Sequence, residues 1–428
     1  MRAWRAPSLF PPLLLLAFLA MAAPVRGQPA GVATTITAED AVRLALQHNQ
    51  PLAAQRLDVD QARADETTAS LKPNLTVYSA NADFPVFHPH NFSWNHLTTN
   101  QSFAEGVSYL FERGGKRRGR QQVAADTTEV AARTVSEAER QVRFSVMQAF
   151  IGVLLARSNL ALALENLADF AEVVAVNQRR LASGDIAEAD FLKIALQKLQ
   201  FEQDVSAARI ALLQGRAALR QLVGYDTLPE DYEVSGDLAH LRHDVTLAEL
   251  TAAAIETRPD LQAARSGITL ATDSLALAVS NRAKDVTGNV EYERDGDLNA
   301  LGFGLSFDLP IHDRNQGEIA RSTVAVRQAQ VAADGARVAV VTDVTTAFAA
   351  YRTADEVASL YESGYLAQAK DSRDISAYAY ERGATSLLDL LDAERTYRDT
   401  QFAFRAALAS YMESVAEINF VVGKQVIP

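Results

Sequence analysis

The chain has 428 residues, of which 48% are hydrophobic and 22% are charged, a balance typical of a folded protein rather than a disordered one. Its 41 lysine and arginine residues are outnumbered by 53 aspartate and glutamate residues, so its mean electrostatic field repels nucleic acid. With no cysteine, the chain can form no disulfide, no thiolate metal site and no N-terminal lipidated cysteine.

Residues 1–27 are typical of a secretory signal peptide. Arg2 and Arg5 precede an apolar run from Leu13 to Met21, and small residues follow that run. The run is too short to serve as a permanent membrane anchor. No later window approaches 18 consecutive apolar residues, so we expect any membrane-spanning part of the exported chain to be built from strands.

Two long segments predict unusually long helices. Residues 115–183 and 314–382 are rich in Ala, Gln, Glu, Arg and Val, and neither contains a proline. At 1.5 Å per residue, each could extend for about 100 Å. Near the C-terminus, apolar residues recur every seven positions, which is typical of coiled-coil packing. The members of this series are Leu390, Tyr397, Phe404, Tyr411 and Ile418.

Two pairs of strands are predicted between the helical segments. Residues 301–309 alternate large apolar side chains with small or polar ones, and residues 286–293 alternate similarly. The turn between these strands is expected at 295–299. Residues 75–83 and 103–111 predict a second, less regular hairpin. Strands of about ten residues with one apolar face have the length that crosses an outer membrane in a barrel. The alternative is the edge of a soluble β-sandwich.

The chain also repeats itself. Gly184 and Gly383 are separated by the same number of residues as Asp190 and Asp389. The repeated unit is predicted to be a helix, two strands, a long helix, a tip and a further helix. Four strands per chain cannot close a conducting barrel, so several copies are expected to combine their strands. Three copies would give about twelve.

The repeat predicts the organisation of the chain. After the signal peptide, residues 28–228 form the first helix-hairpin-helix repeat and residues 246–428 form the second. Residues 229–245 form a linker between them. The two repeats are expected to make one structural unit.

Three segments resemble the TolC family of outer-membrane channels that serve efflux and secretion systems. They are the entry segment 37–46, the strand-to-helix junction 302–317 and the tip segment 380–393. The resemblance covers essentially all of the exported chain. It implies a mainly α chain with β: a long α-helical coiled-coil barrel continuing a transmembrane β-barrel. It also implies that the barrel is 12-stranded in a trimer, with four strands from each chain.

The same resemblance implies a location and partners. The protein would be a homotrimer in outer-membrane lipid, with its helical tunnel in the periplasm. It would contact a periplasmic adaptor, or membrane fusion protein, and an inner-membrane transporter of the RND type. The junction at 310–317 resembles members that serve heavy-metal exporters, so metal cations or small toxic compounds are the expected cargo. No cofactor, no bound metal and no catalysis are expected.

Two glycines and two arginines are the expected adaptor-contact residues. The family arrangement implies that two helix turns lie at the periplasmic mouth of the tunnel. Gly184 and Gly383 suit such turns because glycine tolerates positive φ. Arg180 and Arg382 would lie beside the turns, available to the helical hairpins of an adaptor. Capping of a helix end by a cation is the alternative for Arg180.

Acidic residues near the second turn are the expected pore constriction. Asp389 and Asp392 are three residues apart and share one face of a helix. The resemblance implies that a trimer stacks them as rings of carboxylates, with Asp190 equivalent in the first repeat. Two carboxylates about 8 Å apart repel by roughly 2 kcal/mol at an effective dielectric near 20. Tyr380 matches a gate tyrosine of the founding member, but Thr385 replaces an arginine of that member's closing network. Simple solvation of the acids is the alternative.

Two further groups carry weaker expectations. His88, His90 and His96 fall in the loop between the first two strands, where they could bind a divalent ion. An aromatic-rich loop at the membrane surface is the alternative. The one basic cluster, residues 116–118 with Arg120, predicts contact with anionic lipid headgroups rather than nucleic acid.

Two other functions are the alternatives to an exit duct. A periplasmic coiled-coil scaffold without a channel would explain the long helices. A secreted hydrolase would need a nucleophile and a base, and no such arrangement stands out among the seven histidines and scattered serines.

Overall fold

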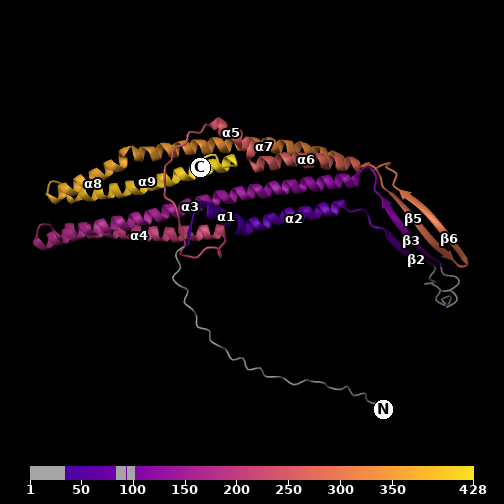
Figure 1. The fold of residues 1–428 in the computed structure, drawn as a ribbon, viewed down its shortest axis with the longest axis horizontal. Coiled ribbons are helices and arrows are strands. Elements are labelled where there is room, and N and C mark those ends of the chain that lie inside the picture. Colours follow the sequence, from indigo (N-terminus) through magenta and orange to yellow (C-terminus); the bar gives the residue numbers. More distant parts are fainter. Residues whose placement is uncertain (1–33, 83–92, 94–101) are drawn as a thin grey trace, which may run out of the picture.

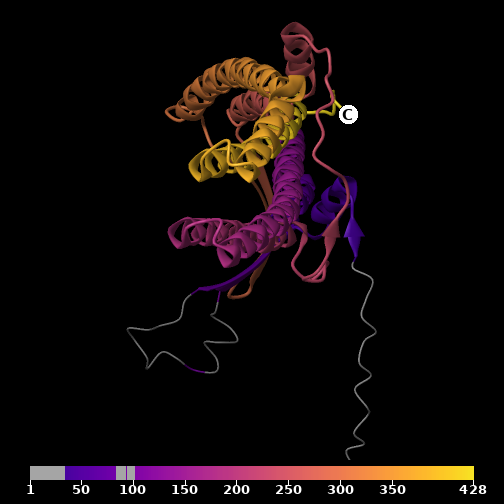
Figure 2. The same ribbon diagram turned by 90° about the vertical axis from the view of Figure 1, so that its left-hand side faces the viewer.

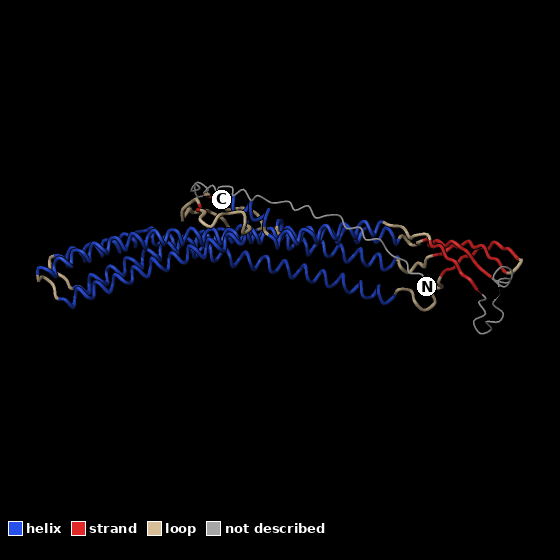
Figure 3. Tube along the Cα trace, turned by 90° about the horizontal axis from the view of Figure 1, so that it is seen from below, coloured by secondary structure: helices blue, strands red, loops and turns tan. Residues whose placement is uncertain are grey.

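The computed structural model describes residues 34–82, 93 and 102–428. The predicted signal peptide and the histidines of the first strand loop lie outside the described residues. The molecule is a long rod, with helices along most of its length and a β-sheet at one end (Figure 1). Seen from below, the helices run side by side into the sheet (Figure 3).

In its described residues, the first half of the chain forms four helices and the first hairpin of the main sheet. In chain order they are α1 (Ala38–His48), α2 (Gln50–Ser70), β2 (Thr76–Ala82), β3 (Ser102–Phe111), α3 (Lys116–Ser183) and α4 (Glu188–Val223). A capping box of Thr37 and Asp40 starts α1, and Pro51 lies in the first turn of α2.

The second half forms the same series of elements with one interruption. They are α5 (Leu247–Thr257), α6 (Pro259–Ser280), β5 (Val286–Asp295), β6 (Leu298–Phe307), α7 (Gln316–Leu360), a π-helical turn (Tyr361–Tyr365), α8 (Leu366–Glu381) and α9 (Leu387–Val422). Two short strands, β1 (Thr35–Ile36) and β4 (Glu233–Val234), pair in parallel, so the predicted linker contains a strand that docks on the start of the chain.

The second long helix is not continuous, and the expectation of an unbroken helix over 314–382 was wrong. The helix breaks at the π-helical turn because Gly364 has φ 127°, outside the helical region. By contrast, the first long helix is confirmed as the 68-residue α3. The two long rods therefore differ in how they can bend.

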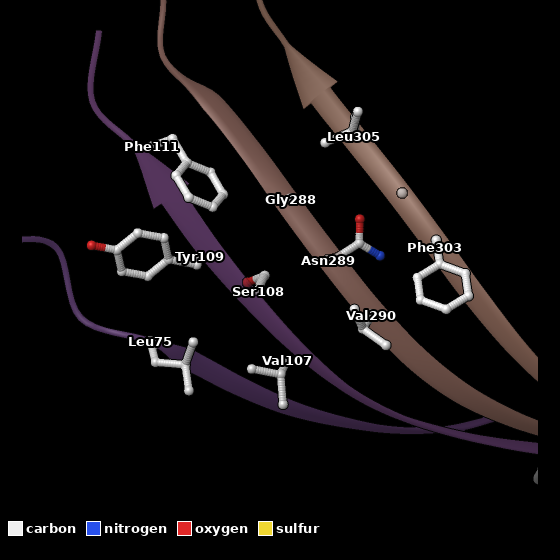
Figure 4. Close-up of a pocket in the computed structure, with 11 residues that line it drawn as sticks. Leu75, Val107, Ser108, Tyr109, Phe111, Gly288, Asn289, Val290, Phe303 and Leu305 are labelled. Carbon is white, nitrogen blue, oxygen red and sulfur yellow. The ribbon is translucent and has the colours of Figure 1, made fainter.

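Both predicted hairpins are confirmed, and they join in one four-stranded antiparallel sheet with the order β2-β3-β5-β6. One face of this sheet, which we call the apolar face, carries large side chains such as Val107, Val290 and Phe303 (Figure 4). Phe303 and Leu305 of β6 are each 76% exposed. A water-facing sheet does not leave a row of such side chains uncovered.

The opposite face, here the polar face, is hydrogen-bonded. Tyr78 of β2 lies opposite Gly106 of β3. Its hydroxyl reaches past Gly106 and donates a 2.6 Å hydrogen bond to Oε2 of Glu291 on β5. Gly302 faces Glu291 from the other side. The alternation predicted for β6 thus separates an apolar side from a polar side.

The helices form an open arc rather than a closed bundle (Figure 2). Near the tips, α3 packs against α4 and α9, and α9 packs against α8. Near the sheet, α3 packs against α2 and α6, and α6 packs against α7. The edges of the arc are therefore α4 and α8 near the tips, and α2 and α7 near the sheet.

The apolar centre of α3 is part of the core. By length and composition α3 passes as a helix that could cross a membrane, and 44% of its most apolar window is buried inside the protomer. Val146, Phe150, Val153 and Leu154 pack there with α1 and α4. Since these side chains already have apolar partners, α3 is a core helix of the rod.

The predicted seven-residue series on α9 also lies along packed surfaces. Leu390, Tyr411 and Ile418 are almost fully buried, and Tyr397 and Phe404 are half-buried. Tyr411 and Ile418 join a core with α5 and α7, while Leu390 joins one at the tips. The spacing therefore predicted the buried stripe of α9.

Candidate channel-mouth site

The two helix turns at the far end of the rod form the candidate site. Gly184 ends α3 with φ 83°, and Gly383 follows α8 with φ 69°. In each turn the glycine N–H and the next N–H donate back to carbonyls of the preceding helix: Gly184 to Leu181 at 3.0 Å and Gly383 to Tyr380 at 3.0 Å. A Cβ at either glycine would meet no other atom, so positive φ is the reason for glycine here.

The structure brings Arg180 and Tyr380 together across the two repeats. The Arg180 guanidinium lies 5.1 Å from the centroid of the Tyr380 ring. Arg382 instead lies over the ring of Tyr378, at 3.5 Å, on the outside of α8. Arg180 therefore has a contact that capping alone does not require, and Arg382 is the more exposed cation of the pair.

Tyr380 is a buried residue within one chain. Its hydroxyl donates a 3.2 Å hydrogen bond to Oδ1 of Asn177 on α3. Burial raises the pKa of Tyr380, which keeps the hydroxyl protonated and able to donate. Phe170, Ile194 and Leu387 surround the ring in an apolar cluster. Tyr380 thus ties the second tip to the first.

Asn177 is a residue that sequence reasoning missed. It is 3% exposed and belongs to a seven-residue series of buried positions on α3. The other members of this series are Ala156, Ala163 and Phe170. A single polar residue in an apolar heptad series is a signal that could have identified it, because such a residue fixes the register of packed helices.

Asp389 has a structural function that the spacing did not predict. Its carboxylate accepts hydrogen bonds from the Ser386 backbone N–H at 3.1 Å and from the hydroxyls of Ser386 and Thr385 at 2.7 Å each. The Asp389 N–H in turn donates to Ser386 Oγ, which completes a capping box at the start of α9. These hydrogen bonds, from Ser386 first and then Thr385, hold the pKa of Asp389 below its usual value.

The other predicted acids differ in their surroundings. Asp190 pairs with Lys193 at 3.0 Å, one turn along α4, so its charge is partly neutralised. Asp392 is exposed on α9, one turn beyond Asp389. Within one chain these three acids do not form a ring, since a ring requires the same residues from neighbouring copies.

The basic cluster at the start of α3 is largely used within the chain. Lys116 forms a 2.8 Å ion pair with Asp285, and Arg117 donates to the Ser70 carbonyl. Arg120 pairs with Glu112. Arg118 is the exposed member of the four. The cluster therefore fastens α3 to the neighbouring loops, and only Arg118 keeps the free surface that lipid contact requires.

In the part of the chain that the structure describes, no three or more His, Asp or Glu side chains are arranged so that they could hold a metal ion.

A one-sided sheet continued by an open arc of long helices defines a class of protein: subunits of ducts that span a membrane and extend beyond it. The chain matches the model of the outer membrane efflux protein family over residues 41–225 and 250–424, and it belongs to that family. It is therefore an outer-membrane efflux channel protein, as its resemblance to TolC channels implied.

Individual proteins are similar to this chain over most of its length. The cobalt-zinc-cadmium resistance protein CzcC of Cupriavidus metallidurans is 25% identical over 401 residues, which cover 92% of each chain. The solved structure of CusC superposes with a TM-score of 0.77 at 19% identity, covering 94% of this chain and 96% of its own. The MtrE outer membrane channel of Neisseria gonorrhoeae has a TM-score of 0.74 at 19% identity, covering 91% of this chain and 89% of its own.

Proposed function

We propose that this protein acts as a homotrimer and serves as the passive exit duct of a tripartite efflux system. The observation that carries the proposal is the four-stranded sheet, which has an exposed apolar face, a polar face and two edge strands, β2 and β6, whose outer edges pair with no other described strand. Three copies would pair these edges and close a 12-stranded barrel with the apolar face toward lipid. Family membership supports a channel. A soluble scaffold or hydrolase would not expose such an apolar face to water.

The edges of the helical arc support the same assembly. On the free face of α4, positions 192, 196, 199, 203, 206, 210 and 213 follow a seven-residue pattern. Five of these seven residues are exposed and apolar: Leu192, Leu196, Leu199, Ile210 and Leu213. At the opposite edge, α8 exposes Ile375 and Tyr378. Two such edges, both exposed in the described part of the chain, fit a coiled-coil seam between copies.

The other half of the rod has matching edges. Val324, Val331 and Val338 recur every seven residues on α7 and are all exposed. Leu57 is exposed on α2, the edge helix across the arc. Pairing α4 with α8 and α2 with α7 of the next copy would close the arc into a tunnel. In this tunnel each chain contributes two repeats, which we assign to residues 28–228 and 246–428. Residues 229–245 join them.

Closure would convert single acids into rings. Asp389 and Asp392 of three copies would line the mouth, with Asp190 nearby, and would favour cations. The exposed tip residues Gly184, Arg382 and Gly383, with Arg180 beside them, would receive the periplasmic adaptor. The inner-membrane transporter, which we assign to the RND type, supplies the energy.

The cargo proposed is metal cations, with small toxic compounds as the alternative. CzcC is named for resistance to cobalt, zinc and cadmium, and the relationship spans nearly the whole length of both chains. The cation preference of the acidic mouth points the same way.

The assembly is tested by joining the two edges covalently. Leu196 lies roughly 15 Å and Ile375 roughly 12 Å from the tips, at 1.5 Å per helical residue, so they are at similar heights. Because the chain has no cysteine, Leu196→Cys with Ile375→Cys introduces the only thiols. Oxidation in membranes should produce a covalent trimer on a non-reducing gel.

The control pairs Leu196→Cys with Val338→Cys on the sheet-side half of the rod, where no contact with Leu196 is expected. A monomer that dissolves without detergent, or equal cross-linking in both pairs, would contradict the proposed trimer.

A further inference from the structure

A buried histidine lies at the break in the second long helix. Nδ1 of His240 is 2.9 Å from Oε2 of Glu362, and Nε2 is 2.8 Å from Oδ1 of Asp355. Asp355 belongs to the last turns of α7, while Glu362 belongs to the π-helical turn with Gly364. One imidazole from the linker therefore bridges the end of α7 and the break that follows it.

The linker is held firmly at this point. The Tyr411 ring of α9 meets the His240 ring edge-on, with centroids 4.5 Å apart, and its hydroxyl donates to the carbonyl of Leu241. From α7, the Tyr351 hydroxyl donates to the His243 carbonyl at 2.9 Å. The imidazole is therefore held in place when Glu362 moves outward, because its ring contacts Tyr411 and the backbone that follows it is hydrogen-bonded to α9 and α7.

The charges around the imidazole are unequal. The side chains of His240 and Asp355 are only 5% and 9% exposed, whereas that of Glu362 is 46% exposed. Asp355 has a second cation in Arg242, at 3.6 Å. Among the described residues, the only ion pair of Glu362 is the one with His240. Two phenols also lie here: Tyr411 meets the imidazole, and the Tyr351 ring is 5.7 Å from the Tyr411 ring.

We propose that His240 is a proton-operated latch that sets the angle between α7 and α8, closed when the imidazole is protonated and released when it is neutral. An imidazolium donates from both nitrogens and satisfies both carboxylates. Neutral imidazole has one N–H, so one carboxylate would then face a nitrogen lone pair. The arm that opens is the one to Glu362, because Asp355 keeps Arg242 and is buried.

The break is suited to respond. Glu362 lies two residues before Gly364, whose positive φ sets the change in chain direction and which has no Cβ to restrict another backbone angle. In α3 the equivalent stretch is a continuous helix, so the latch belongs to the second repeat alone. The proposal concerns the rod itself and is independent of the cargo.

The direction of the pH response follows from the two protonation states. Burial alone would lower the pKa of His240, but the hydrogen bonds that the imidazole donates to Glu362 and Asp355 outweigh burial and raise it above 6.5. The latch therefore contributes its full stability below pH 6.5 and loses it as the pH rises through the pKa of the folded state.

A distance measurement across the break tests the latch. Thr353→Cys on α7 and Ser372→Cys on α8 place spin labels at exposed positions of the full-length, otherwise cysteine-free protein in detergent. Dilution with unlabelled chain isolates distances within one chain. Pulsed electron resonance should give one narrow distribution at pH 5.5, and a shifted or broader distribution at pH 9.

Three variants make the test specific. His240→Gln should give the open distribution at both pH values. Glu362→Gln, at a half-exposed position that folding tolerates, should also abolish the pH response. His243→Gln is the matched control, because His243 contacts Tyr351 through its backbone, and it should keep the response. An unchanging distribution in the native protein, or a response that survives both His240→Gln and Glu362→Gln, would overturn the latch.

Discussion

The hydroxyl of Tyr380 donates a 3.2 Å hydrogen bond to Asn177, 203 residues earlier in the chain. It joins α8 to α3 at the end of the rod, where no strand holds the two halves together. Both residues are at least nine-tenths buried, so the bond is protected from water. It is the polar link between the two tips.

Tyr380→Phe should loosen the tips without unfolding the rod. The substitution removes one hydrogen bond, worth about 1 kcal/mol, and leaves the ring in its apolar cluster. We expect a higher single-channel conductance in planar bilayers, because the tips separate more often. Tyr225→Phe, at an exposed position beyond the end of α4 that lies away from the tips, is the control. Equal conductance of the two variants would show that the link does not restrain the mouth.

Asp392→Asn should reduce cation selectivity while leaving stability unchanged. Asp392 is exposed and lies outside the capping box, so its charge is the main property lost. The reversal potential in a salt gradient should move toward zero. Asp389→Asn should move it as well, but should also lower the unfolding temperature because it weakens the cap of α9. An unaltered reversal potential in both variants would rule out an acidic ring.

Gly383→Val should weaken capture of the adaptor. A β-branched residue at φ 69° is strained by about 1–2 kcal/mol, so the turn must change shape. Co-purification with the adaptor should fall by several-fold, while the heat-modifiable barrel band persists. Gly335→Ala, inside α7 and with open space around its Cβ, should bind normally. Normal capture by Gly383→Val would move the contact elsewhere.

Gly106→Val should prevent the sheet from forming. The Tyr78 ring crosses directly over Gly106 to reach Glu291, so a side chain at Gly106 would occupy the space of that ring. We expect loss of the barrel from outer-membrane fractions. At Gly288, on the apolar face, a Cβ would be 3.4 Å from the Phe111 ring, an ordinary contact. Gly288→Ala should therefore assemble, and its failure would indicate that any added side chain disrupts the sheet.

Local patterns predicted the elements well. The alternation over 301–309 identified β6 and its apolar side, because side chains of a strand point to opposite faces in turn. The proline-free stretch over 115–183 identified α3, and the recurrence of Leu390, Tyr411 and Ile418 identified the buried stripe of α9. Gly184 and Gly383 were correctly placed at turns.

The contacts of the site were harder to predict. Ser386 stands three residues before Asp389, which is the spacing of a capping box. The interpretation of Asp389 as part of an acidic ring overlooked that box. The basic cluster predicts contact with lipid headgroups, yet Lys116 pairs with Asp285, 169 residues away, and Arg120 pairs with Glu112 in the loop before α3. Electrostatic pairing depends on three-dimensional distance, which spacing along a helix reveals only for near neighbours.

The sequence by itself determined the lengths and faces of the helices and strands, since these follow from periodicity, proline placement and the permissive backbone of glycine. Tertiary structure alone decided which distant residues meet. A lone glycine such as Gly364 is tolerated in many helices, so the break in the second rod was not evident from its own segment. The imidazole of His240 comes from a linker more than a hundred residues earlier, and it lies at that break because Tyr411 and Tyr351 hold the ring and the backbone that follows it.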